Sequence, residues 1–251
     1  MSGDQGHSSG AYPGPLLSGD QGWRREQNRL GGSKDSVVRL RVGSANVGTL
    51  RERCGEITDM AWRRQLDICC LQEVRWKEGS ARTLEVAGAR YKLFWIGCDQ
   101  GVSGFGVMVS EKWMEHVVEV KRISERLLVV RLAIGRVILN VVSVYASQGG
   151  RPMAEKEKLL AQLGKVVSMI SGDEGLIVCG DFNGHVDSAS DGFERVHGGR
   201  GFGSRNMQGE CFWSFRLQWN SLWQTRGLLR VTRKKSLTSQ VECRLWWTIC
   251  W

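Results

Sequence analysis

A run of apolar residues, Leu176–Cys179, leads directly into Gly180–His185, which reads Gly-Asp-Phe-Asn-Gly-His. The run is short, β-branched and bounded by glycine, which is typical of a buried strand. Side chains two apart in an extended segment point the same way, so Asp181 and Asn183 are predicted to face one point while Phe182 packs. A carboxylate beside an amide can hold an attacking water, because the carboxylate accepts its proton and the amide orients it. The alternative is a hairpin turn, for which Asn-Gly is the strongest short signal.

Apolar or alternating segments along the rest of the chain predict a β-rich protein. Helices are expected at 55–66 and from Pro152 to Ile170, and further strands at 37–44, 67–73, 91–98, 105–110, 117–123, 127–134 and 137–145. The later strands follow one another through short, turn-like gaps, which favours antiparallel pairing. We therefore expect an α/β fold, a layered sandwich of two mainly antiparallel sheets flanked by helices.

Four of the expected strands end on polar residues. These are Asn46, Glu73, Tyr145, and Asp181 with Asn183. If the four ends lie at one edge of the sheets, their side chains form a site. Each has an ordinary structural alternative: Asn46 as a turn former, Glu73 as a solvated carboxylate, and Tyr145 as an aromatic residue at a rim.

Four segments, in this order and at roughly these spacings, resemble the endonuclease/exonuclease/phosphatase superfamily. They are Ser44–Val47, Leu71–Glu73, Val144–Ala146 and Gly180–Asn183. The resemblance covers about residues 37–210 and is closest to craniofacial development protein 2-like proteins and to the endonuclease domains of LINE retrotransposons. The segments Asp191–Glu194 and Gly201–Asn206 also match that group.

The resemblance implies a phosphodiesterase or endonuclease that uses Mg²⁺, with Mn²⁺ as the alternative ion. Glu73 would be a metal ligand and Asn46 would support the metal and phosphate, because a hard cation held by one or two carboxylates suits phosphate substrates. Asp181 would orient or deprotonate the attacking water, with Asn183 beside it. Tyr145 would donate a hydrogen bond to the phosphate.

The resemblance also implies a nucleic acid as partner, with DNA expected, and contacts to it from Arg205 and Asn206. The alternative for Arg205 is an ordinary surface cation, and His185 is more typical of a structural histidine. The eight cysteines are scattered without a C-x-x-C pair, and no membrane span is visible, so an intracellular compartment, nuclear or cytoplasmic, is expected. The sequence does not define an oligomeric state.

The two ends differ in composition from the middle. Residues 1–36 are rich in Gly and Ser and repeat Ser-Gly-Asp-Gln-Gly, which indicates a disordered leader. Residues 211–251 carry seven basic and one acidic side chain, a net charge of +6 out of +9, and six of the eleven Trp. We expect an aberrant, basic, Trp-rich tail that is loosely attached to a domain at 37–210.

The family's late Asp-Tyr segment and terminal Ser-Asp-His are not found. Residues 211–251 contain no Asp, and His185 and His197 are the only histidines after Asp181. The Trp codon is TGG and Thr codons begin AC, so Trp246–Thr248 read one base out of frame gives Val-Asp, similar to the missing segment. We therefore expect a frameshift near residue 210, an incomplete second sheet and impaired catalysis. A non-catalytic remnant that at most binds nucleic acid, and a phosphatase of the same superfamily, are the alternatives.

Overall fold

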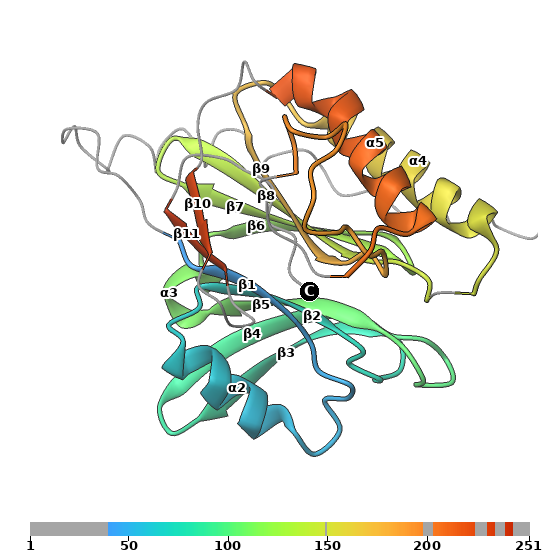
Figure 1. Ribbon diagram of the computed structural model, residues 1–251. Helices are drawn as coiled ribbons and strands as arrows, with labels where there is room; N and C mark the ends of the chain where they lie inside the picture. Colours follow the sequence, from blue (N-terminus) through green and yellow to red (C-terminus); the bar gives the residue numbers. More distant parts are fainter. Residues whose placement is uncertain (1–39, 149, 198–202, 224–229, 234–238, 243–251) are drawn as a thin grey trace, which may run out of the picture. The chain divides into compact units, whose positions relative to one another are not determined.

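The computed structural model describes residues 40–148, 150–197, 203–223, 230–233 and 239–242 (Figure 1). The chain divides into two units, residues 1–36 and 37–251, and every described residue belongs to the second unit. The leader expected at residues 1–36 therefore lies outside the described residues. No described helix is long and apolar enough to cross a membrane.

The first sheet has five strands in the order β1-β2-β5-β4-β3. The strands are β1 (Val42–Asn46), β2 (Ile68–Gln72), β3 (Gly79–Val86), β4 (Ala89–Ile96) and β5 (Phe105–Ser110). Strands β1 and β2 are parallel and the other neighbouring pairs are antiparallel. A parallel pair needs a crossover connection, and helix α2 (Cys54–Arg63) supplies it. Ile57 and Ala61, one helical turn apart, face the sheet from α2 and are buried. The short helix α3 (Glu111–Met114) follows β5.

The second sheet has four strands in the order β6-β7-β8-β9 and is open. They are β6 (Val117–Ser124), β7 (Leu127–Ile134), β8 (Val137–Tyr145) and β9 (Gly175–Asp181). Strands β8 and β9 are parallel, as β1 and β2 are in the first sheet, and helix α4 (Met153–Met169) connects the two strands. Leu159, Leu163 and Val166 of α4 are buried in a second apolar cluster, together with strand residues such as Val142 and Val178.

The two sheets face each other (Figure 1). Apolar side chains from both sheets form the core between them. The first sheet contributes Ile68 and Val107 among others, and the second contributes Val141 and Ile177. The Cys179 Sγ atom lies 3.6 Å from the carbonyl oxygen of Gly43, so β9 and β1 meet across this core. The predicted sandwich of two mainly antiparallel sheets is therefore confirmed.

Five elements were not expected from the sequence: the short helix α3, strand β3 and the three elements that follow β9. Strand β3 has no apolar pattern in the sequence, because most of its side chains are exposed. Helix α5 (Met207–Trp223) crosses the expected boundary at residue 210, and its Phe212 and Trp213 side chains are each 2% exposed. The expectation of a loosely attached tail is therefore wrong for residues 211–218. Farther along, β10 (Arg230–Arg233) and β11 (Ser239–Glu242) pair as an antiparallel hairpin.

Candidate active site

Two pairs of parallel strands bring the predicted strand ends together. In the first sheet Asn46 lies opposite Gln72, so Asn46 and Glu73 leave β1 and β2 at the same edge. In the second sheet Tyr145 lies opposite Asp181 at the ends of β8 and β9. Adjacent parallel strands run in the same direction and end at the same edge, so each pair places two polar residues side by side.

Gly180 allows the close pairing of β8 and β9 just before Asp181. Its φ is +148°, and a Cβ atom on it would lie 1.9 Å from the carbonyl oxygen of Val144. A side chain at this position would collide with the neighbouring strand. The glycine of the Gly-Asp-Phe-Asn segment therefore sets Asp181 directly beside Tyr145.

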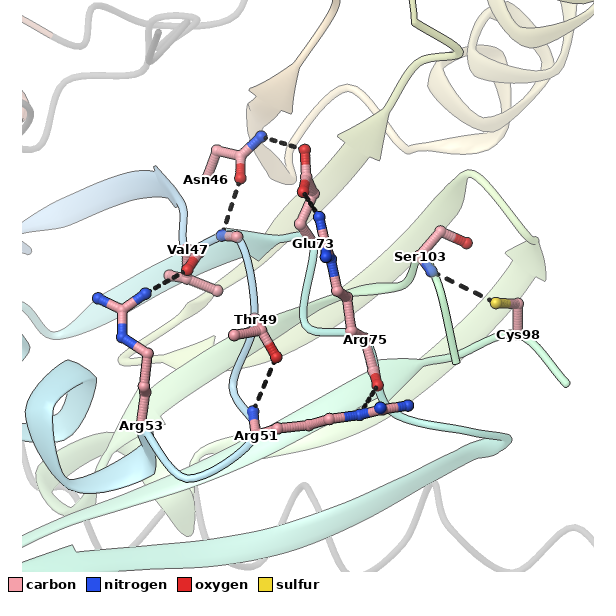
Figure 2. A network of polar contacts seen from close by, with 10 residues as sticks. Asn46, Val47, Thr49, Arg51, Arg53, Glu73, Arg75, Cys98 and Ser103 are labelled. Atoms are coloured by element: carbon pink, nitrogen blue, oxygen red, sulfur yellow. Dashed lines mark hydrogen bonds and ion pairs between the residues drawn. The ribbon is translucent and has the colours of Figure 1, made fainter. Parts of the chain in front are cut away.

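Two nitrogen donors hold the Glu73 carboxylate (Figure 2). Asn46 Nδ2 donates to Oε1 at 2.9 Å, and Arg75 Nη2 donates to Oε2 at 2.8 Å. These contacts, that of Asn46 foremost, lower the pKa of Glu73, so the carboxylate is ionised at neutral pH. Asn46 is itself oriented, because its Oδ1 accepts a hydrogen bond from Gly48 N–H at 3.1 Å.

Three arginines in the loops after β1 and β2 were not predicted: Arg75 pairs with the Glu73 carboxylate, whereas Arg51 and Arg53 bind backbone carbonyls. Arg51 donates from Nε to the Arg75 carbonyl and from Nη2 to the Gly101 carbonyl, each at 3.1 Å. Arg53 donates from Nη1 to the Val47 carbonyl at 2.8 Å (Figure 2). Arg75 lies two residues after Glu73 and could have been suspected from that spacing. Arg51 had no signal, because its partners are distant in sequence.

Asp181 and Asn183 are joined by a turn and not by an extended strand. Strand β9 ends at Asp181, and Asn183 has a φ of +47°. The Asn183 backbone N–H donates to Asp181 Oδ1 at 2.8 Å, and its Nδ2 donates to the Ala146 carbonyl at 2.8 Å. This is an Asx-turn, in which an aspartate side chain binds the backbone two residues on. The prediction that strand geometry points both side chains the same way is therefore wrong, although the two residues are in contact.

Tyr145 interacts electrostatically with carboxylates from both pairs of strand ends. Burial raises the pKa of Tyr145, and the negative charges of Glu73 and Asp181 raise it further. The Phe105 ring lies 6.3 Å from the Tyr145 ring, centroid to centroid, and the Arg126 guanidinium carbon lies 5.4 Å from the Tyr145 centroid. Both carboxylates therefore lie within electrostatic range of the Tyr145 phenol. The phenol stays protonated at neutral pH and can donate a hydrogen bond.

Arg205 is engaged in holding the loop that follows Asp181. It donates from Nη2 to the Ala189 carbonyl at 2.9 Å and from Nη1 to the Asp191 carbonyl at 3.1 Å. Its guanidinium carbon lies 4.9 Å from the centroid of the Phe193 ring. The nucleic-acid contact expected of Arg205 stays a prediction.

Asn206 caps helix α5. Its Oδ1 accepts hydrogen bonds from Gly209 N–H at 2.9 Å and from His185 N–H at 3.1 Å. The first bond is that of an N-cap residue, and the second ties the helix start to the loop after Asn183. The nucleic-acid contact expected of Asn206 also stays a prediction. The structural contacts of Arg205 and Asn206 involve partners that local sequence patterns do not reveal.

The oxygen donors at this edge suit a hard cation. No group of three or more His, Cys, Asp or Glu side chains gathers within the described ranges. Mg²⁺, however, is usually held by one or two carboxylates, with waters and substrate phosphate completing its shell. The ionised Glu73, with the Asn46 side chain fixed against it, fits such a ligand set.

Comparisons with known proteins point to one family. The model of the endonuclease/exonuclease/phosphatase family matches residues 43–233, which is more than half of the chain. No curated protein matches the sequence.

Solved structures of several nucleases and a phosphatase are similar to the chain. The endonuclease domain of TRAS1, a telomere-specific non-LTR retrotransposon, is 16% identical, with a TM-score of 0.48 over 78% of this chain and 76% of that one. The 3′ phosphatase NExo from Neisseria, bound to a product DNA hairpin, is 15% identical, with a TM-score of 0.49 over 81% and 86%. An AP endonuclease from Archaeoglobus fulgidus is 14% identical, with a TM-score of 0.46 over 80% and 86%. At such identities the likeness concerns the fold alone. By the family match, the chain belongs to the endonuclease/exonuclease/phosphatase family.

Proposed function

We propose that this domain is a Mg²⁺-dependent phosphodiesterase that cleaves nucleic acid, of the retroelement endonuclease type. The observation that carries the proposal is the set of polar strand ends: Asn46 is bonded to Glu73 in the first sheet, and Tyr145 lies opposite Asp181 in the second. Both carboxylates lie within electrostatic range of the Tyr145 phenol, and such a set can hold a phosphate, a metal and a water. Endonucleases, exonucleases and phosphatases, which give the family its name, all hydrolyse phosphate esters.

In the proposed reaction the chain's own residues position the substrate and the water. Asp181 accepts the proton of the attacking water, and the Asn183 N–H fixes the Asp181 carboxylate. Protonated Tyr145 donates a hydrogen bond to a phosphate oxygen. Glu73 and Asn46 would hold Mg²⁺, which when bound neutralises charge on the phosphate and the leaving oxygen.

The arginines near the candidate site favour the binding of a polyanionic substrate. Arg75 pairs with Glu73, Arg51 binds the Arg75 carbonyl, and Arg126 lies over the Tyr145 ring. Arginine pairs with phosphate through several N–H donors, so a cluster at the edge of the site suits a nucleic-acid backbone. DNA is the expected substrate, and its binding should weaken steeply as salt is added.

A non-catalytic nucleic-acid-binding domain is the second candidate. The family resemblance implies a histidine on the phosphate, and His197 does not suit that role. It is 3% exposed, and its Nε2 lies 3.0 Å from the Val186 carbonyl and 3.1 Å from the Asp187 carbonyl. A phosphatase for small phosphate esters within the same family is the further alternative.

Plasmid nicking with Mg²⁺ tests the proposal. Within one site, acid–base and phosphate-contacting groups typically contribute about 10²–10⁴ in rate. We expect the native 251-residue chain to nick plasmid DNA at least ~10³-fold more slowly than a relative that carries the terminal Ser-Asp-His. The Asp181→Ala and Glu73→Gln variants should lose the activity that the native chain retains. Asp191→Asn, on an exposed side chain, is the matched control. Equal rates for the native chain and Asp181→Ala, with salt-sensitive DNA binding intact, would establish the second candidate.

A further inference from the structure

Three buried polar side chains lie between the two sheets, next to the candidate site. Ser44 is 2% exposed, Gln72 is 1% exposed and Ser143 is 0% exposed. The residues two positions before them belong to the core between the sheets: Val42, Cys70 and Val141. Side chains two apart in a strand share one face, so the three polar side chains point into the same core.

Two polar atoms of this set lack a partner within the described part of the chain. Ser44 Oγ donates to Gln72 Oε1 at 3.1 Å. Gln72 Nε2 and Ser143 Oγ have no hydrogen-bond partner among the described residues. An unpaired donor in an apolar core is costly, and nearly all buried polar groups bind either protein or internal water. The two atoms therefore need a partner that the described side chains do not supply.

Contacts of Cys179 bring Ser143 toward Ser44 across the core. Ser143 of β8 and Cys179 of β9 are direct neighbours in the second sheet. The Cys179 Sγ atom lies 3.6 Å from the carbonyl oxygen of Gly43, the residue before Ser44 in the first sheet. Because Ser44 is bonded to Gln72, this contact sets Ser143 opposite the pair in the first sheet.

A second set of contacts, independent of the first, gives the same placement. Gln72 and Phe105 are direct neighbours in the first sheet. The Phe105 ring lies 6.3 Å from the Tyr145 ring, centroid to centroid. Tyr145 follows Ser143 by two positions in β8, so both side chains point into the core. Gln72 therefore faces the part of β8 that carries Ser143 and Tyr145.

We propose that Ser44, Gln72 and Ser143 bind one internal water, which joins the two sheets and sets the spacing between the two halves of the candidate site. The water oxygen accepts hydrogen bonds from Gln72 Nε2 and Ser143 Oγ, and the water donates to Ser44 Oγ. Three polar partners are typical of a buried water. Gln72 directly precedes Glu73, and Ser143 is two residues from Tyr145, so the bridge links one strand end of each sheet. The proposal does not depend on the phosphodiester chemistry.

Urea unfolding tests the shared water in four chains: the native chain, Ser143→Ala, Gln72→Met and the double variant. Removing an unpaired hydroxyl from a dry core would raise the urea midpoint. Removing a hydroxyl that holds a shared water should instead lower it. We expect each single variant to lower the midpoint and the double variant to lower it by less than the sum, because both changes break the same bridge. A higher midpoint in Ser143→Ala, or effects that add, would overturn the proposal.

Thr58→Val is the matched control for this cycle. Thr58 is a buried residue of α2, and its hydroxyl donates to the Cys54 carbonyl at 2.7 Å. Its effect should add to that of Ser143→Ala, as expected for distant sites. Equal coupling in the control pair and in the Gln72 pair would show that no specific bridge exists.

A second measurement uses the native chain alone, so it holds even if Gln72→Met does not fold. With ¹⁵N-labelled glutamine, the side-chain amide protons of Gln72 should show cross-peaks to water whose NOE and ROE have opposite signs, the signature of a long-lived bound water. Gln65, which is exposed, is the reference and should show no such pair of cross-peaks. If Gln72 behaves as Gln65 does, no internal water is bound there and the proposal is wrong.

The spacing between the two halves can be measured at Tyr145. Burial raises the pKa of Tyr145, and the charge of Glu73 from the other sheet raises it further. We expect the pKa of Tyr145 to shift down toward its ordinary value in Ser143→Ala, as the halves loosen, in an NMR titration of its Cζ atom. Tyr91, in the cluster on the other face of the first sheet, is the reference. An unchanged Tyr145 pKa would show that the water does not set the spacing, and would contradict the proposal.

Discussion

At the scale of single residues, Glu73 is held in an uncommon conformation. Its φ is +57°, in the left-handed region that residues other than glycine seldom adopt, at a cost of about 1–3 kcal/mol. Hydrogen bonds from Asn46 and Arg75 keep it there. Asn183 shares the left-handed conformation, with a φ of +47°. Six further described residues other than glycine share a positive φ, so this conformation is not confined to the candidate site.

The stability of the protein should depend on pH through Glu73. Its pKa is lower in the folded chain than in the unfolded one, so the ionised carboxylate contributes stability above the unfolded pKa of about 4.3, and this is lost as pH falls through the folded value. In urea unfolding, we expect Glu73→Gln to be less stable than the native chain at pH 7. The difference should shrink below about pH 4. A difference independent of pH would contradict this account.

Asn46 should be the main cause of the low Glu73 pKa. Its amide makes the largest contribution, ahead of Arg75. We expect Asn46→Ala to raise the Glu73 pKa toward its ordinary value, measured by NMR titration of the side-chain carboxyl carbon. Thr49→Ala, a nearby loop substitution, is the matched control and should leave the pKa unchanged. A larger rise in Arg75→Gln than in Asn46→Ala would show that the ion pair dominates.

At the scale of elements, helix α5 supports the loop that carries the candidate catalytic residues. Asn206 at its start binds both its own helix and His185. The first turn packs so closely that a Cβ on Gly209 would lie 1.8 Å from the His185 carbonyl oxygen. The Phe212 ring lies 4.6 Å, centroid to centroid, from the ring of Phe182, the residue that follows Asp181. The helix therefore fixes the segment Gly180–His185.

Loss of the Asn206 cap should loosen this loop. Asn206→Ala removes the acceptor of two backbone N–H groups, and we expect it to cost about 1 kcal/mol in urea unfolding. Hydrogen exchange at the His185 amide should become faster. Asn206→Asp keeps an oxygen that can accept both hydrogen bonds and should therefore restore the protection. Ser204→Ala, on an exposed side chain, is the control. Equal protection of His185 in all variants would show that the second bond is not formed in solution.

At the scale of the whole molecule, the sandwich depends on two crossovers. Helices α2 and α4 each join parallel strands, and these two parallel pairs, β1 with β2 and β8 with β9, carry the polar ends. The sheets then face each other through one aliphatic core. The site therefore exists only when both crossovers and the sheet-to-sheet packing are complete, because each sheet contributes half of it.

Limited proteolysis should show where the folded domain ends. Because Phe212 and Trp213 are buried against α4 and the second sheet, we expect the resistant fragment to extend past residue 210 and to include both side chains. Mass spectrometry of the fragment gives its end directly. Trp213→Ala, which leaves a cavity, should cost about 3–5 kcal/mol and expose α5 to cleavage. A resistant fragment that ends near residue 210 would instead support the domain boundary expected from the sequence.

The sequence by itself determined most strands, the crossover helices, the fold class and the residues at the four strand ends. Those features follow from local periodicity and from short motifs, which depend only on residues close together in the sequence. Tertiary structure alone decided that Tyr145 lies opposite Asp181, that Asn46 and Arg75 hold the Glu73 carboxylate, and that Phe212 and Trp213 of α5 are buried. Contacts between residues far apart in sequence leave no local pattern. The burial of α5 depends on the space that α4 and the second sheet leave free for it. The sequence of residues 207–223 does not specify that space.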